Sequence, residues 1–140
     1  MHLYVETSAA LQDLLDGEAA AEIRSALKSS TLLFTSRLTL AEVGRVLART
    51  RVLEPELAGR LAAREAAWFG ETERWVVHPV SDDILARGAM PWPAEPVRTL
   101  DGIHLATIET LSSVVSDLVV VTTDLRIRHN CVALRHPVLP

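Results

Sequence analysis

The chain contains only one cysteine, Cys131, and one lysine, Lys28, in 140 residues. A single thiol cannot form an internal disulfide, and there is no CxxC pair or Cys/His cluster that would indicate zinc. Cys131 is therefore predicted to be a small core residue. Because Lys28 is the only lysine, positive charge is carried almost entirely by arginine, whose planar guanidinium can bind phosphate or carboxylate through two hydrogen bonds.

Long apolar runs, excess positive charge and glycine-rich phosphate-binding loops are also missing. The longest apolar runs, such as Leu118 to Val121, are far shorter than the ~20 residues that span a bilayer, so no membrane segment is predicted. The N-terminal MHLYVETS lacks the basic and apolar regions of a secretory signal, which predicts a cytoplasmic location. The formal net charge of −4 argues against a protein that coats nucleic acid non-specifically. No motif indicates a nucleotide cofactor or a covalent hydrolase.

With 140 residues, 49% of them hydrophobic, the chain is expected to form one domain, 1–140, without a linker. Strand-like segments alternate with segments of helical spacing, which predicts an α/β fold with a parallel sheet. The predicted strands are Leu3–Glu6, Leu32–Thr35, Trp75–Val80 and Leu118–Thr122, with an edge strand in the tail. The predicted helices are Ala9–Leu15, Ala19–Leu27, Leu38–Arg49, Glu56–Phe69, Asp82–Arg87 and Asp101–Leu111, with a short one after Leu125. The proline-rich segment Met90–Pro96 is a predicted loop, and its Trp92 offers a possible stacking surface for a base.

Four acidic residues lie at or near the ends of predicted elements: Glu6 in YVETSA, Glu42 in LTLAEV, Asp101 in LDGIHLA and Asp124 in VVTTDLR. Glu6 and Asp124 fall at strand ends, and open parallel sheets bind ligands outside the carboxyl ends of their strands. Mg²⁺ and Mn²⁺ prefer oxygen ligands, and one or two carboxylates with water and substrate phosphate complete their coordination. The pattern predicts one assembled carboxylate site.

The two aspartates also have ordinary structural roles open to them. Asp101 shares a helical stripe with Leu105 and Ile108, where a carboxylate is costly unless it is paired, hydrogen-bonded or bound to a metal. An aspartate in a first helical turn can instead serve the free N–H groups there. Asp124 follows a buried strand, where an aspartate is often the N-cap of the next helix. Both the site role and the capping role stay open for each.

The two glutamates differ in how strongly they indicate a site. Glu42 lies near Arg45 and Arg49 at the edge of an apolar arc, a pattern typical of a solvated ion-pair face. Glu6 ends an apolar strand shortly before Ser8, whose hydroxyl could cap the next helix or orient a carboxylate. Because glutamate is a poor N-cap, the position of Glu6 favours a site role.

Three further residues are candidates for contact with a substrate. His104 lies near the Asp101 stripe, although a histidine on a partly apolar helix face is more often a hydrogen-bonded structural residue. Arg126 and Arg128 follow Asp124 and could meet phosphates, with a solvated surface as the ordinary alternative.

Read in order, YVETSA, LTLAEV, TLDGIHLA and VVTTD resemble the PIN domain, and more closely the VapC-type toxins of bacterial toxin–antitoxin pairs. The likeness covers nearly the whole chain, including the terminal HPVLP. It implies a three-layer α/β/α fold around a central, mainly parallel sheet. It also implies Mg²⁺- or Mn²⁺-dependent cleavage of RNA, a homodimer, and inhibition by a cognate VapB-type antitoxin.

In this resemblance Glu6, Glu42, Asp101 and Asp124 match the family's acidic positions, and Ser8 and Thr122 match supporting hydroxyl positions. The implied hypothesis is that Glu6, Asp101 and Asp124 hold the metal, with Glu42 as a ligand or a water-orienting group. The chain departs from the family at its first acid, where aspartate is usual and glutamate adds one methylene. A displacement of the metal by about an ångström can be expensive.

Two other classes of protein are compatible with parts of this pattern. A phospho-acceptor signalling domain also has acids at strand ends, but it needs a late lysine, and Lys28 is early. A PIN-like module without activity would act by binding an antitoxin or another protein through apolar grooves. We expect the active metal-dependent ribonuclease, because the three acids after Glu6 match the family.

Overall fold

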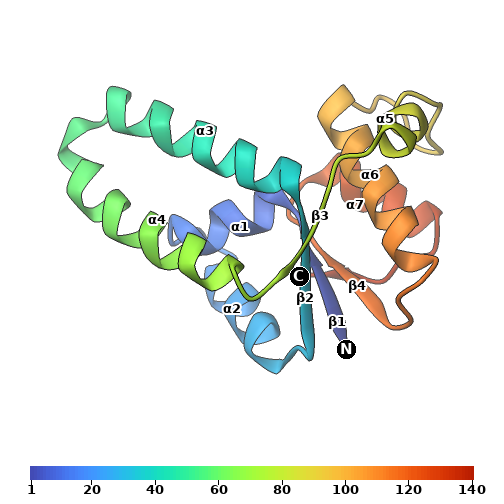
Figure 1. The fold of residues 1–140 in the computed structure, drawn as a ribbon, viewed down its shortest axis with the longest axis horizontal. Helices are drawn as coiled ribbons and strands as arrows, with labels where there is room; N and C mark the ends of the chain where they lie inside the picture. Colours follow the sequence, from blue (N-terminus) through green and yellow to red (C-terminus); the bar gives the residue numbers. More distant parts are fainter.

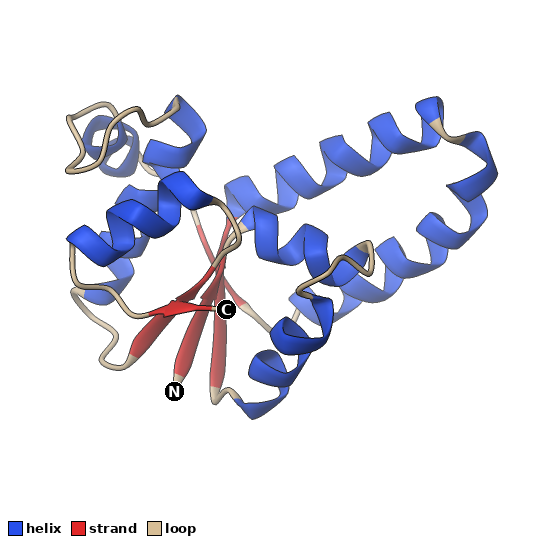
Figure 2. Cartoon of the chain, turned by 180° about the vertical axis from the view of Figure 1, so that it is seen from behind, coloured by secondary structure: helices blue, strands red, loops and turns tan.

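A computed structural model describes all 140 residues as a central sheet with helices on both sides (Figures 1 and 2). Helices α1 to α4 cover one face, and α5 to α7 cover the other (Figure 1). The strands are β1 (His2–Val5), β2 (Leu32–Ser36), β3 (Val76–His78), β4 (Leu118–Val121) and β5 (Val138–Leu139). The helices are α1 (Thr7–Leu14), α2 (Ala20–Ser29), α3 (Arg37–Leu53), α4 (Ala58–Thr72), α5 (Asp82–Gly88), α6 (Thr99–Ser112) and α7 (Leu125–Ala133), with a 3-10 turn at Pro55–Leu57.

The five strands are all parallel and lie in the order β3-β2-β1-β4-β5. In the centre of the sheet, His2 of β1 is in register with Leu32 on one side and Leu118 on the other. All strands therefore end at the same edge, where the helices that follow them begin. The predicted α/β/α fold with a mainly parallel sheet is confirmed.

Alternating side chains of β1 face two separate apolar cores. Leu3 and Val5 pack into the core beneath α1 to α4, whereas Tyr4 points into the core beneath α5 to α7. This alternation follows from the two-residue period of a strand. Cys131 is fully buried in the second core, as predicted, and this burial raises the pKa of its thiol to about 12. None of the helices is both long and apolar enough to span a bilayer.

Several element ends differ from the sequence prediction for local reasons. Helix α1 begins at Thr7 rather than Ala9, because Glu6 caps it after all. Strand β3 stops at His78, before Pro79, since proline has no N–H for a sheet ladder. Strand β2 continues to Ser36, whose hydroxyl accepts a hydrogen bond from the Leu38 N–H and so caps α3. These ends depend on cap contacts that periodicity does not reveal.

The expectation that Trp92 offers a stacking surface for a base is wrong, because Trp92 is buried. Its ring is 5% exposed, and its indole N–H donates to the Gly88 carbonyl at 3.3 Å. The Arg87 guanidinium lies 3.7 Å from the centre of the ring. Trp92 therefore fixes the loop before α6 against the end of α5.

The start of α6 is packed against the end of α5 through two glycines. A Cβ added at Gly102 would lie 2.5 Å from the Gly88 carbonyl oxygen. A Cβ at Gly88 would in turn lie 3.2 Å from the backbone of Gly102. This approach needs the absence of a side chain, and it fixes the turn of α6 that carries Asp101.

We predict that Gly102→Ala destabilises the protein by about 1–3 kcal/mol, because the new methyl overlaps a backbone carbonyl that cannot swing away. The matched control is Gly44→Ala in the middle of α3, where an added Cβ meets nothing within 4 Å. That change should stabilise the helix by about 0.5–1 kcal/mol. Urea unfolding of both variants measures the difference, and equal effects would contradict the close packing of α5 on α6.

Candidate active site

Glu6 is the residue at the carboxyl end of β1, and its side chain is held by three donors. Its Oε2 accepts hydrogen bonds from the Ser8 N–H at 3.0 Å, the Ser8 hydroxyl at 2.5 Å and the Thr122 hydroxyl at 2.8 Å. The residue is only 4% exposed. A buried carboxylate is tolerated when charge-assisted hydrogen bonds of this kind replace water. The longer side chain of glutamate thus folds back onto the first turn of α1.

The Ser8 hydroxyl also connects Glu6 to the end of β4. Its oxygen accepts hydrogen bonds from the backbone N–H groups of Thr123 at 2.9 Å and Asp124 at 3.1 Å. The Thr122 hydroxyl oxygen accepts from the Asp124 N–H as well, at 3.1 Å. Ser8 and Thr122 therefore join residues more than 110 positions apart into one unit.

Glu42 extends from α3 into a second polar network. Its Oε1 accepts hydrogen bonds from the Thr7 hydroxyl and from His104 Nε2, each at 2.7 Å. His104 Nε2 lies 3.8 Å from Glu6 Oε1, so this network and the Glu6 unit are neighbours. The other His104 nitrogen, Nδ1, lies 2.9 Å from the Tyr4 hydroxyl. The ion-pair face with Arg45 and Arg49 is not formed, so Glu42 belongs to the interior edge of the site.

The pKa of Glu42 is set by opposing effects. Partial burial raises it, but the hydrogen bonds from His104 and Thr7 together outweigh burial and hold the pKa below the usual 4.5. For Tyr4, burial first, and then the nearby charges of Glu6 and Glu42, place the pKa of the phenol well above 10. Glu42 is thus ionised and Tyr4 is neutral at physiological pH.

The two aspartates cap helices, which was one of the two roles open to each from the sequence. Asp101 Oδ2 accepts from the Arg98 N–H at 3.2 Å before α6, and Asp124 Oδ1 accepts from the Arg126 and Ile127 N–H groups at 2.8 and 3.2 Å. Each caps with a single oxygen. The capping role therefore leaves half of each carboxylate for another partner.

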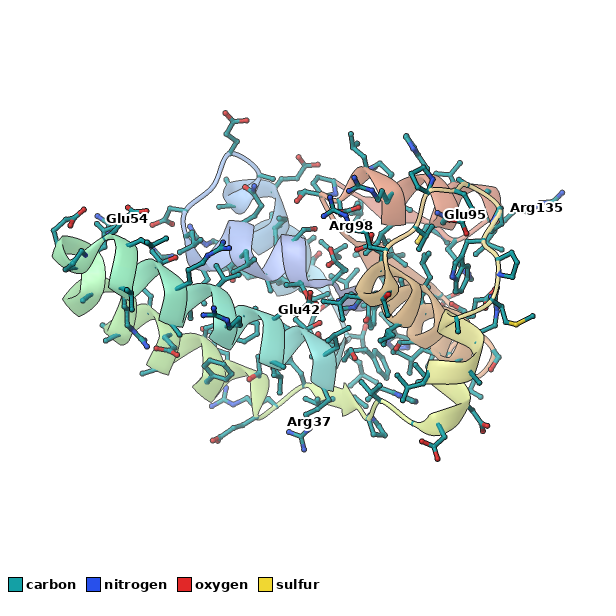
Figure 3. The ribbon with its side chains drawn as sticks, turned by 90° about the horizontal axis from the view of Figure 1, so that it is seen from above. Arg37, Glu42, Glu54, Glu95, Arg98 and Arg135 are labelled. Atoms are coloured by element: carbon teal, nitrogen blue, oxygen red, sulfur yellow. The ribbon has the colours of Figure 1, made fainter.

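In all four acids one carboxylate oxygen is hydrogen-bonded within the protein and the other is not. Glu6 Oε1, Glu42 Oε2, Asp101 Oδ1 and Asp124 Oδ2 accept no hydrogen bond from the protein, whereas the second oxygen of each is bound as described. Seen from above, Glu42 and Arg98 both lie in the central part of the molecule, while Glu54 lies at the far end of α3 (Figure 3). The free oxygens thus belong to elements that converge on one edge of the sheet.

The donor set fits a hard divalent cation better than zinc. The available atoms are carboxylate oxygens, and both nitrogens of His104 are already engaged. No three His, Cys, Asp or Glu side chains are close enough to form a closed metal cluster. Mg²⁺ and Mn²⁺ do not require one, since water and substrate phosphate supply much of their shell.

The three expected substrate residues have different environments. His104 is 1% exposed with both nitrogens bonded, which does not fit direct contact with a substrate. The Arg128 guanidinium donates to the carbonyls of Thr122 and Pro140, so it anchors the C-terminal segment. Only the side chain of Arg126 is half-buried without a hydrogen-bond or ion-pair partner.

Sequence reasoning missed Tyr4 and Thr7, which complete the network around His104. Tyr4 is the only tyrosine and stands in an otherwise apolar strand, so its hydroxyl needed a buried partner. That requirement was a usable signal. Thr7 gave no signal of its own, because a threonine after a strand is common.

An all-parallel sheet with carboxylates at the ends of its central strands defines a class of α/β protein with an acidic site at the carboxyl edge. The PIN domain model matches residues 3–132, so the chain belongs to the PIN domain family and the predicted resemblance is confirmed. The comparison with curated protein sequences gave no match.

Several solved structures share the fold over nearly their full length. The toxin–antitoxin complex from Klebsiella pneumoniae has a TM-score of 0.65 at 18% identity, covering 99% of this chain and 96% of that chain. VapC20 of Mycobacterium tuberculosis, described as a sarcin-ricin loop cleaving toxin, has a TM-score of 0.64 at 16% identity, with coverages of 91% and 93%. FitAcB from Neisseria gonorrhoeae has a TM-score of 0.60 at 19% identity, with coverages of 99% and 96%.

The lowered pKa of Glu42 predicts how the variant Glu42→Gln responds to acid. The stability that the ionised Glu42 contributes is complete above the pKa of an unfolded glutamate and is lost as pH falls through the lower folded pKa. Glu42→Gln should therefore be less stable than the parent at neutral pH, and this deficit should shrink well below pH 4.5. Urea unfolding in EDTA measures both conditions.

The control for this prediction is Glu73→Gln, which alters an exposed carboxylate that accepts no hydrogen bond from another residue. It should show little difference from the parent at either pH. A Glu42→Gln deficit that stays constant from neutral to acid pH would show that the charge of Glu42 is not what the network stabilises.

Proposed function

We propose that the chain is a metal-dependent endoribonuclease and the toxin of a type II toxin–antitoxin pair. The observation that carries this proposal is the free oxygen on each of the four acids, while the other oxygen is fixed by the fold. Free carboxylate oxygens that converge on one edge provide for a hard cation and a phosphate. The name of VapC20, a toxin that cleaves the sarcin-ricin loop, supports RNA as the substrate.

In this proposal Glu6, Asp101 and Asp124 bind Mg²⁺ or Mn²⁺ through their free oxygens, in part by way of water molecules, because no three of these acids form a closed cluster. When bound, the cation supplies Lewis-acid activation of water and neutralises charge on the leaving oxygen. Glu42 orients the attacking water through Oε2. Arg126 contacts a phosphate of the RNA, because its guanidinium has no partner in the protein and it lies in the first turn of α7.

The first test is cleavage of a mixed RNA pool by antitoxin-free protein in Mg²⁺, Mn²⁺ or EDTA. We expect cleavage with either cation and none in EDTA. Asp101→Asn should abolish cleavage, because it removes a charged ligand while the amide oxygen can still accept from the Arg98 N–H. Cleavage by Asp101→Asn at the parent rate would refute the proposed site.

The variant Glu6→Asp tests whether glutamate at this position is an adaptation. Aspartate is one methylene shorter and would lose the reach to the donors at Ser8 and Thr122. We expect slower cleavage by Glu6→Asp, because the fold around Glu6 is built for the longer side chain. If neither the parent nor Glu6→Asp cleaves RNA, a PIN-like module that acts by binding a partner becomes the better account.

A cavity of about 340 Å³ between α1, α2 and α4 supports the antitoxin part of the proposal. Its apolar floor includes Leu14, Leu27 and Trp68, and its rim carries Lys28 and Glu71. Trp68 is 4% exposed, yet its indole N–H has no hydrogen-bond partner. An unpaired buried donor is costly, and an antitoxin segment with an apolar side chain and a nearby carbonyl would satisfy it.

Two neighbouring alanines of α4 allow a matched test of this cavity. Ala67 lines it and is exposed, whereas Ala66 is exposed but does not line it. We expect Ala67→Arg to weaken binding of the cognate antitoxin in a calorimetric titration and Ala66→Arg to leave it unchanged, with RNA cleavage unaffected in both. Equal affinities of the two variants would place the antitoxin elsewhere.

The proposal also includes a homodimer that acts in the cytoplasm. Family resemblance supports the dimer, and apolar side chains exposed at Leu100 and Leu125 are compatible with a second copy packing nearby. Light scattering of the antitoxin-free protein measures this assembly directly.

A further inference from the structure

The buried network of Tyr4, His104 and Glu42 has no part in holding the cation as proposed above. We infer that His104, backed by Tyr4, is a positioning residue that fixes the Glu42 carboxylate for cleavage. The inference rests on the proposed ribonuclease function. It assigns His104 a role through Glu42 rather than contact with the RNA, because His104 is 1% exposed.

The hydrogen bonds determine which His104 nitrogen carries the proton. An ionised carboxylate only accepts, so the 2.7 Å contact with Glu42 Oε1 requires a proton on Nε2. In a neutral ring Nδ1 is then an acceptor, and the Tyr4 hydroxyl donates to it at 2.9 Å. The Thr7 hydroxyl donates to the same Glu42 oxygen. With this assignment each of these buried donors has an acceptor.

His104 and Glu42 come from opposite sides of the sheet. Glu42 is on α3, which packs on one face, and His104 is on α6, which packs on the other (Figure 1). Their hydrogen bond therefore crosses the carboxyl edge and ties the two helical layers together at the site. Tyr4 supports the ring from the central strand, where it is fully buried.

This arrangement leaves Glu42 with little freedom to turn. Two donors from different helices, Thr7 of α1 and His104 of α6, hold Oε1 and lie 3.0 Å from each other, so the orientation of the carboxylate, and with it the position of Oε2, is restrained. Without the His104 N–H, only Thr7 would restrain a long, flexible side chain that is partly open to solvent. Groups that orient a functional carboxylate in this way commonly change activity about 10–100-fold when they are removed.

The first experiment reads the proton position in the metal-free protein, independently of cleavage. Nitrogen-15 spectra of the His104 ring should show a proton on Nε2 and an Nδ1 that accepts a hydrogen bond. Tyr4→Phe should shift the Nδ1 resonance by removing its hydrogen bond. A proton found on Nδ1, or no response of Nδ1 to Tyr4→Phe, would overturn the network as derived.

The second experiment compares two amide replacements of similar polarity. The His104→Gln side chain reaches the position of Nε2 and can still donate to Glu42, whereas that of His104→Asn ends near Nδ1 and cannot. We expect kcat of His104→Asn to fall about 10–100-fold with KM little changed. His104→Gln should recover most of the parent kcat.

Controls separate this role from general stability and from the proposed function. Thr107→Val removes a buried hydroxyl of the same helix that bonds only to the Ile103 carbonyl, and it should leave kcat unchanged. Equal kcat values for His104→Gln and His104→Asn would overturn the role of His104. The ribonuclease proposal would still stand if the parent cleaves RNA and Asp101→Asn does not. If the parent does not cleave RNA, the proposed function is overturned. The nitrogen-15 spectra would then still test the hydrogen bonds of His104 with Tyr4 and Glu42.

Discussion

Negative charge gathered at one edge of the sheet is the constraint on which this structure depends. A parallel sheet built from β-α units brings acids at strand ends together, and it brings helix N-termini to the same edge. Glu6 and Asp124 cap α1 and α7, and Asp101 caps α6 from its first turn. The positive ends of these helices offset the carboxylates that the topology assembles. The topology that gathers the carboxylates therefore also supplies the helix N-termini that offset their charge.

The structure shows how the buried side chain of Glu6 is accommodated at the end of β1. Ser8 and Thr122 bind one Glu6 oxygen, and their own oxygens accept the backbone N–H of Asp124. The Glu6 carboxylate is thereby held against these two hydroxyls. Glu42 is held in the same way, because Thr7 and His104 both donate hydrogen bonds to one of its oxygens.

The order of strands and helices could be predicted from the sequence because apolar periodicity is local. That order, in a parallel sheet, also predicts that the four acids lie at the same edge of the sheet. The partners of Glu42 could not be predicted, since its neighbours along α3 are arginines and its actual donors come from α1 and α6. The burial of Trp92 was missed for a related reason, because Arg87 and Gly88 cover a ring that a proline-rich loop seemed to expose.

The link between Glu6 and Thr122 has a consequence for the timing of synthesis. β1 precedes its parallel partner β4 in the chain, and the Thr122 hydroxyl that binds Glu6 lies 116 residues after Glu6. A growing polypeptide on the ribosome therefore cannot complete the acidic edge until β4 has emerged and paired. Before that point Glu6 lacks the Thr122 hydroxyl, so a nascent chain carries β1 without the completed acidic edge.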